Sequence, residues 1–139
     1  MNWIDKRLRR ATLRTLFRAR VLLTDPGLWH PEDDASFKNY SGKIVRTSAS
    51  DPRAKFWSIH GALIRVANFD KEIGYRQVEA AISVLLRFAP DEKLRDLLDH
   101  ETAVMQMELN KWEKHPTTTK EDILRVFDRS INFIIEDME

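Results

Sequence analysis

NWIDKRLRRATLRTLFRARVLL (Asn2–Leu23) is the stretch that decides the fold of this chain. At roughly 100° per residue, a helix over this range sorts its side chains onto two faces. The apolar face consists of aliphatic residues: Ile4, Leu8, Ala11, Ala19, Leu22 and Leu23, with Leu16 at its margin. We therefore expect half of this helix to be buried in a core formed with the rest of the chain.

The opposite face of the helix mixes basic and large apolar side chains. Its basic residues are Lys6, Arg7, Arg10, Arg14 and Arg18, and Trp3, Phe17 and Val21 lie among them. Arginine beside an aromatic ring suits contacts with phosphates, bases or carboxylates. The alternative is a solvated face whose arginine stems cover neighbouring apolar surface. The candidate partner-binding residues are Trp3, Arg7, Arg10, Arg14, Phe17 and Arg18.

Composition places the chain among folded proteins. It has 139 residues, of which 42% are hydrophobic and 32% charged, so we expect one domain over residues 1–139 with a sizeable core. The absence of cysteine excludes disulfides and thiolate chemistry, and it fits a reducing, cytoplasmic compartment. No apolar run approaches the roughly 20 residues of a membrane span, so we expect no membrane partner.

The net charge of +1 hides a gradient along the chain. Residues 1–23 hold seven basic residues and one acid, whereas residues 91–139 hold seven basic and 13 acidic residues. Such separation favours association, either within one molecule or between copies in a homodimer. It also weakens the case for nucleic acid, because the domain as a whole is far from strongly basic.

The remaining sequence predicts further helices and one small β element. Phe37 to Val45, around Ser41-Gly42, predicts a hairpin over residues 36–47, and Asp51-Pro52 predicts the start of a second helix. Gly61 inside that helix predicts a close approach of another backbone. Later helices are expected over residues 71–89, over residues 91–112, and after a capping box at Thr118 and Glu121. The fold class is therefore mainly α: one domain of four to five helices with a small β-hairpin.

The order of these pieces resembles a family of small bacterial and phage-borne proteins known only as a domain of unknown function. The resemblance rests chiefly on Asp51-Pro52-Arg53-Ala54-Lys55-Phe56-Trp57-Ser58-Ile59-His60-Gly61-Ala62-Leu63. This chain has Ser58 where the family often has cysteine, and Glu113-Lys114 where it often has Asn-Asp. The resemblance implies a fold and a phage or mobile-element origin, and it implies no reaction.

Candidate catalytic residues are few. None of His30, His60, His100 and His115 stands in a metal-ligand spacing, and the sequence contains no Gly-rich phosphate loop. We interpret His60 as a core histidine whose hydrogen bonds are satisfied. An enzyme would need a pocket near His60, Tyr40 or Trp112 that holds at least two converging polar groups. We expect no catalytic residue, no metal site and no cofactor.

The sequence therefore favours a non-enzymatic binding or regulatory protein that contacts an acidic protein partner through the basic face of its first helix. A nucleic-acid-binding accessory protein that uses the same face is the alternative. A small enzyme with a pocket near His60 ranks below both.

Overall fold

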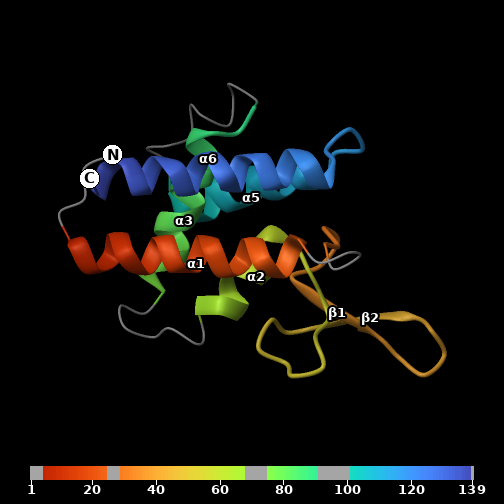
Figure 1. Cartoon of the computed structure of the whole chain (residues 1–139). Helices are drawn as coiled ribbons and strands as arrows, with labels where there is room; N and C mark the ends of the chain where they lie inside the picture. Colours follow the sequence, from red (N-terminus) through yellow and green to blue (C-terminus); the bar gives the residue numbers. More distant parts are fainter. Residues whose placement is uncertain (1–4, 25–28, 68–74, 91–100, 139) are drawn as a thin grey trace.

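The computed structural model describes residues 5–24, 29–67, 75–90 and 101–138, and it shows a mainly α fold, as the sequence predicts. Five helices and a three-stranded antiparallel sheet are found in these segments (Figure 1). The elements are α1 (Lys6–Thr24), β1 (Ala35–Lys38), β2 (Ile44–Thr47), β3 (Phe56–Trp57), α2 (Ile59–Ala67), α3 (Arg76–Arg87), α5 (Thr102–Lys114) and α6 (Lys120–Met138).

The side chain of Asp5 caps the N-terminus of helix α1. Asp5 Oδ1 accepts hydrogen bonds from the backbone nitrogens of Arg7 (2.9 Å) and Leu8 (3.4 Å), which satisfies two amides of the first turn. The side chains that α1 buries are Ala11, Thr12, Thr15, Leu16, Ala19 and Leu23. The predicted inner face is thus confirmed from Ala11 onward, and it also includes two threonines.

Helices α1 and α6 lie side by side and run in opposite directions (Figure 1). Arg9 near the start of α1 binds Asp137 near the end of α6, at 3.1 Å. Arg20 near the end of α1 binds Asp128 of α6. The Lys120 ammonium at the start of α6 donates to the Thr24 carbonyl at 2.7 Å. The basic first helix and the acidic C-terminal half therefore attract each other within one molecule.

The predicted hairpin is present, and a third strand extends it. β1 pairs with β2 so that Phe37 lies opposite Val45, and β1 pairs on its other edge with β3. Gly42 closes the turn with a φ of 78°, a conformation that glycine adopts readily. The sheet lies beside the C-terminal end of α1 (Figure 1).

The prediction that Asp51-Pro52 begins the second helix is wrong. Asp51 Oδ1 accepts from the Arg53 backbone nitrogen, and the Asp51 carbonyl accepts from the nitrogen of Ala54, so these residues form a turn. An Asp-Pro pair suits such a turn as well as a helix start. The chain then returns to the sheet, and α2 begins only at Ile59, where Ser58 Oγ accepts from the nitrogen of Gly61.

The predicted cap of the last helix lies one residue too early. The reciprocal hydrogen bonds join Thr119 to Asp122: Asp122 Oδ2 accepts from the Thr119 nitrogen, and Thr119 Oγ1 accepts from the Asp122 nitrogen. The local chemistry is that of a capping box, shifted because Thr118 instead donates its hydroxyl to the Trp112 carbonyl.

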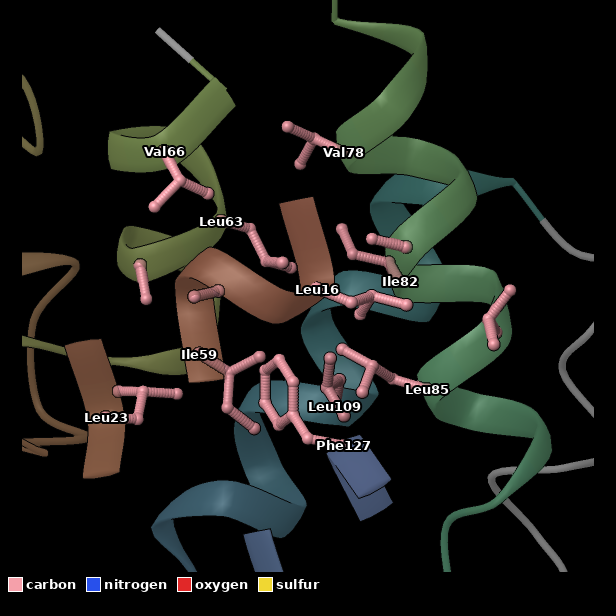
Figure 2. Packing of buried hydrophobic residues seen from close by; sticks show 14 of the residues in the cluster. Leu16, Leu23, Ile59, Leu63, Val66, Val78, Ile82, Leu85, Leu109 and Phe127 are labelled. Carbon is pink, nitrogen blue, oxygen red and sulfur yellow. The ribbon is translucent and has the colours of Figure 1, made fainter. Parts of the chain in front are cut away.

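One core joins all five helices. Leu16, Ile59, Ile82, Leu109 and Phe127, one from each helix, are at most 1% exposed. Their side chains point toward one another (Figure 2). The residues predicted to face inward from the third helix are buried as well, including Val78 of α3 and Ala89 just after its end. The predictions for Asn2 to Ile4 and for residues 91–100 lie outside the described residues.

Candidate functional site

The predicted partner-binding residues fall into three groups in the structure. Arg7, Arg10, Phe17 and Arg18 are exposed on α1, and Phe17 is 47% exposed. Arg14 is half-buried and interacts within the protein. Trp3 lies outside the described residues. Four of the six side chains therefore face solvent on one helix.

The other two arginines of the first helix have structural roles. Arg20 grips Asp128 with two hydrogen bonds, from Nε at 2.6 Å and from Nη2 at 3.2 Å, and Arg9 binds both the carboxylate and the backbone carbonyl of Asp137. The paired fork of a guanidinium holds a carboxylate in a fixed geometry. These pairs link α1 to α6, and the buried face of α1 packs into the core, so the exposed residues of α1 stand on a packed support.

An open groove of about 430 Å³ runs between α1 and α6. It is lined by Phe17, Arg20, Val21, Asp128, Ile131, Asn132 and Ile135. Val21 is 60% exposed, and Phe17 and Ile135 are also large exposed apolar residues. These three side chains together form a small apolar patch at the groove.

Several cations of α1 are available to a partner. Within the described segments, Lys6, Arg10 and Arg18 form no ion pair or side-chain hydrogen bond, and Arg7 is only 4.0 Å from Asp5. We call the surface formed by Arg10, Phe17, Arg18, Val21 and Ile135 the α1–α6 face.

A second cluster lies at the N-terminus of α2. His60 is 8% exposed; its Nδ1 lies 3.1 Å from Asp34 Oδ1, and its Nε2 lies 3.1 Å from the Tyr75 hydroxyl. Gly61 allows this arrangement, because an added Cβ would come within 1.6 Å of the Asp34 carbonyl oxygen. The close backbone approach predicted from Gly61 is confirmed, and so is a core histidine with satisfied hydrogen bonds.

The polarity of this chain of hydrogen bonds follows from its charges. The hydrogen bond from His60 is the main reason that the pKa of the Asp34 carboxyl is lowered. A carboxylate only accepts, so Asp34 Oδ1 accepts from Nδ1–H of His60; in the tautomer with its proton on Nδ1, Nε2 accepts from the Tyr75 hydroxyl. Burial, together with the charges of Asp34 and Glu79, raises the pKa of the Tyr75 phenol, which therefore keeps its proton.

Glu113 is the most unusual residue of this region. It is 1% exposed, and its Oε2 accepts from Trp29 Nε1 and from the backbone nitrogen of Ile59, each at 2.7 Å. Its Oε1 has no hydrogen-bond partner in the described residues. Burial raises the pKa of Glu113 to about 7, although the two hydrogen bonds oppose the shift.

These groups form a structural cluster. Ser58 Oγ accepts from Gly61 and lies 3.5 Å from Asp34 Oδ1, so it caps α2 and has no contact with the imidazole that would activate it. Tyr40 lies elsewhere, on the hairpin, and Trp112 packs against the core. The prediction of an enzyme with a pocket near His60, Tyr40 or Trp112 stays a prediction. The described residues contain no group of three or more side chains that could hold a metal ion.

Sequence reasoning missed Glu113 and Asp34 as partners of the second helix. The signal for Glu113 is its spacing: Met105, Leu109 and Glu113 follow one another at four-residue intervals, and all three are buried. A carboxylate on such an apolar stripe indicates a buried acceptor. The signal for Asp34 is absent, because its 26-residue separation from His60 is set by the fold of the sheet.

The fold is thus a small helical domain with a three-stranded sheet at one end, which carries an exposed basic and apolar helix face. The chain belongs to a family of unknown function, DUF6197, whose match spans residues 8–133. No curated protein and no solved structure matches the chain. None of the helices in the described segments is both long and apolar enough to cross a bilayer.

Proposed function

We propose that this protein is a non-enzymatic binding protein whose α1–α6 face receives an acidic protein segment that also carries apolar side chains. The observation that carries the proposal is the position of Phe17 and Val21: both are exposed at a groove, and Arg10 and Arg18 on the same helix are available for carboxylates. A reducing, cytoplasmic setting and a phage or mobile-element origin remain predictions.

The chemistry of the face supports an amphipathic partner. Interfaces combine an apolar centre with a polar rim, and arginine and aromatic residues are frequent anchors. Phe17, Val21 and Ile135 supply the apolar centre, and the arginines supply a rim of positive charge. An acidic helix that displays leucine or phenylalanine on one side would match both parts.

The rigidity of the face also supports binding. The buried face of α1 packs in the core against α2, α3 and α6, and the ion pairs Arg9–Asp137 and Arg20–Asp128 add contacts to α6. A face that is already fixed loses little conformational entropy when a partner binds. Nucleic acid on the same face is the alternative.

The test uses two blocked synthetic peptides: an amphipathic acidic peptide with leucine and phenylalanine on one side, and its Gln/Asn analogue. We expect the acidic peptide to bind in calorimetry, with an affinity that falls as salt rises, and the neutral analogue to bind at least tenfold more weakly. The double substitution Arg10→Gln with Arg18→Gln should weaken binding of the acidic peptide about tenfold, equivalent to ~1.4 kcal/mol.

The matched control is Lys38→Gln with Lys55→Gln, which removes the same charge from the sheet and should leave peptide binding unchanged. Phe17→Ser should weaken binding of the peptide at both low and high salt. Because the side chain of Phe17 is exposed, the variant should still fold. Equal binding of the two peptides, or equal loss in the two double variants, would contradict the proposal. A homodimer that occupies the face would appear as a doubled mass in sedimentation that Arg10→Gln with Arg18→Gln abolishes.

A further inference from the structure

The three-stranded sheet carries a second basic surface, separate from the α1–α6 face. Residues 35–57 contain five basic residues and one acid, Asp51. This excess of positive charge is not apparent from the net charge of the region, because the acidic residues Glu32, Asp33 and Asp34 directly precede it. In the structure Lys38, Lys43 and Lys55 are exposed.

The single acid of the sheet is already neutralised. Asp51 Oδ1 accepts from Arg53 Nε at 3.2 Å, Asp51 Oδ2 accepts from Arg53 Nη2 at 2.9 Å, and Thr47 donates its hydroxyl to the same carboxylate. An incoming anion therefore meets the lysines without an uncompensated carboxylate on the sheet.

The same ion pair places a flat cation over an aromatic ring. The Arg53 guanidinium carbon lies 4.7 Å from the centre of the Phe37 ring, and Asp51 holds the guanidinium in this position. Phe37 and Val45 lie opposite each other on β1 and β2. The stacked pair therefore forms part of a surface suited to planar, delocalised groups.

An open groove of about 660 Å³ occupies this surface. It is lined by Phe37, Lys38, Tyr40, Val45, Arg53 and Lys55, among others. Aromatic rings and cations thus line the same groove. Its volume lies in the range of ligand sites, and it is open to solvent.

Tyr40 projects from the tip of the hairpin, and the tip is held in place. Asn39 Oδ1 accepts from the backbone nitrogens of Ser41 and Lys43, and the Asn39 carbonyl accepts from Gly42. The side chain of Tyr40 is fully exposed. A fixed turn that presents an uncovered aromatic ring beside lysines offers a stacking platform at low entropic cost.

We propose that the sheet β2-β1-β3 binds single-stranded nucleic acid, with bases on Tyr40 and on the Phe37–Arg53 pair and phosphates on Lys38, Lys43 and Lys55. Base faces are accessible in single strands and hidden in a duplex, so aromatic platforms select the single strand. The site shares no residue with the α1–α6 face, and it stands or falls independently of the function proposed above.

The test is fluorescence anisotropy of the whole protein with labelled oligothymidylate at low salt. We expect saturable binding whose affinity falls with salt, with a slope of about −2 for three contacted phosphates. A duplex of equal length should bind at least tenfold more weakly at the same salt. Tyr40→Ala should weaken binding of the single strand about 5- to 100-fold, because one stacked base is lost.

Substitution of Lys38→Gln with Lys55→Gln should reduce the salt slope by about 1.4, because two phosphate contacts disappear. The matched control is Lys111→Gln with Arg129→Gln, which removes equal charge from exposed positions on α5 and α6 and should keep the slope and the affinity. All substituted side chains are exposed, and circular dichroism checks the fold of each variant.

Three results would overturn the proposal: no anisotropy change at low salt, a Tyr40→Ala variant that binds as tightly as the unmodified chain, or equal losses in the two double variants. A fourth result would also overturn the proposal: the acidic peptide binds more tightly than oligothymidylate, and Lys38→Gln with Lys55→Gln abolishes binding of the peptide. The sheet would then be assigned to a protein partner.

Discussion

The carboxylate of Glu113 accepts a hydrogen bond from the indole nitrogen of Trp29 across 84 residues of sequence, at 2.7 Å. The same oxygen accepts from the backbone nitrogen of Ile59, the first residue of α2. One buried side chain of α5 thus holds both the segment before the sheet and the start of α2. The position of the sheet relative to the helices depends on this contact.

The stability of the protein should depend on pH through Glu113. Its pKa in the folded state, about 7, lies above its ordinary value of 4.5, so folding takes up a proton between these values. The free energy of unfolding should therefore fall as pH rises through this window, by roughly 3 kcal/mol in total. Urea unfolding at a series of pH values measures it.

Glu113→Gln should remove most of that dependence. The amide oxygen can still accept from Trp29 and Ile59, and no charge is buried, so the variant should be more stable than the unmodified chain above pH 7. Glu113→Ala, in contrast, leaves two buried donors without an acceptor and should cost roughly 3 kcal/mol or more. A Gln variant that unfolds with the same pH profile as the unmodified chain would show that another group is responsible.

Gly61 should tolerate no side chain. The Cβ of Gly61→Ala would lie 1.6 Å from the Asp34 carbonyl oxygen, so α2 or the sheet must move, at a cost of roughly 4 kcal/mol or more. Gly42→Ala is the control, because nothing lies within 4 Å of its Cβ and only the positive φ is strained, which costs about 1 kcal/mol. Thermal unfolding compares them, and equal losses would refute the close approach at Gly61.

Asp34 should stabilise the fold only where it is ionised. Its pKa is lowered by His60, so its contribution is present above the ordinary value of 3.8 and is lost as pH falls through the folded-state pKa. Asp34→Asn should therefore cost about 1 kcal/mol at pH 7 and less in strong acid. Glu32→Gln, at an exposed position nearby, should change little at either pH. A cost for Asp34→Asn that does not depend on pH would argue against the ionised carboxylate as the acceptor of the hydrogen bond from His60.

The Arg20–Asp128 contact should contribute little free energy despite its length of 2.6 Å. Both side chains are partly exposed to solvent, and pairs of this kind are typically worth less than ~1 kcal/mol. A double-mutant cycle with Arg20→Gln and Asp128→Asn measures the coupling. A coupling well above 2 kcal/mol would mean that α1 is held to α6 mainly by charge rather than by the core.

Local patterns predicted much of this fold. The spacing of Ala11, Ala19 and Leu23 placed the buried face of α1, and the glycine at position 42 placed the hairpin. These features depend on residues a few positions apart, where helix and strand periodicity act directly. The Asp51-Pro52 pair was misinterpreted because the same two residues suit a turn and a helix start. The backbone hydrogen bond from the Lys55 nitrogen to the Ser36 carbonyl favours the turn.

The site was only partly predictable from sequence. Exposure of Arg10, Phe17 and Arg18 follows from the helix period. The groove that Phe17 lines also needs Ile131 and Ile135 of α6. Tertiary packing decides which arginines of α1 interact within the protein: Arg14 does so, and Arg9 and Arg20 form ion pairs with α6. The basic surface of the sheet arises because three strands bring Lys38, Lys55 and Arg53 to one groove.

The most direct test of the central claim is a titration of isotope-labelled protein with the acidic amphipathic peptide, followed by amide chemical shifts. Binding at the α1–α6 face predicts shifts that cluster at Phe17, Arg18 and Val21 on α1 and at Asn132 and Ile135 on α6, while the strands stay unchanged. The shifts should vanish in Arg10→Gln with Arg18→Gln. No shifts, or shifts confined to residues 35–57, would contradict the account.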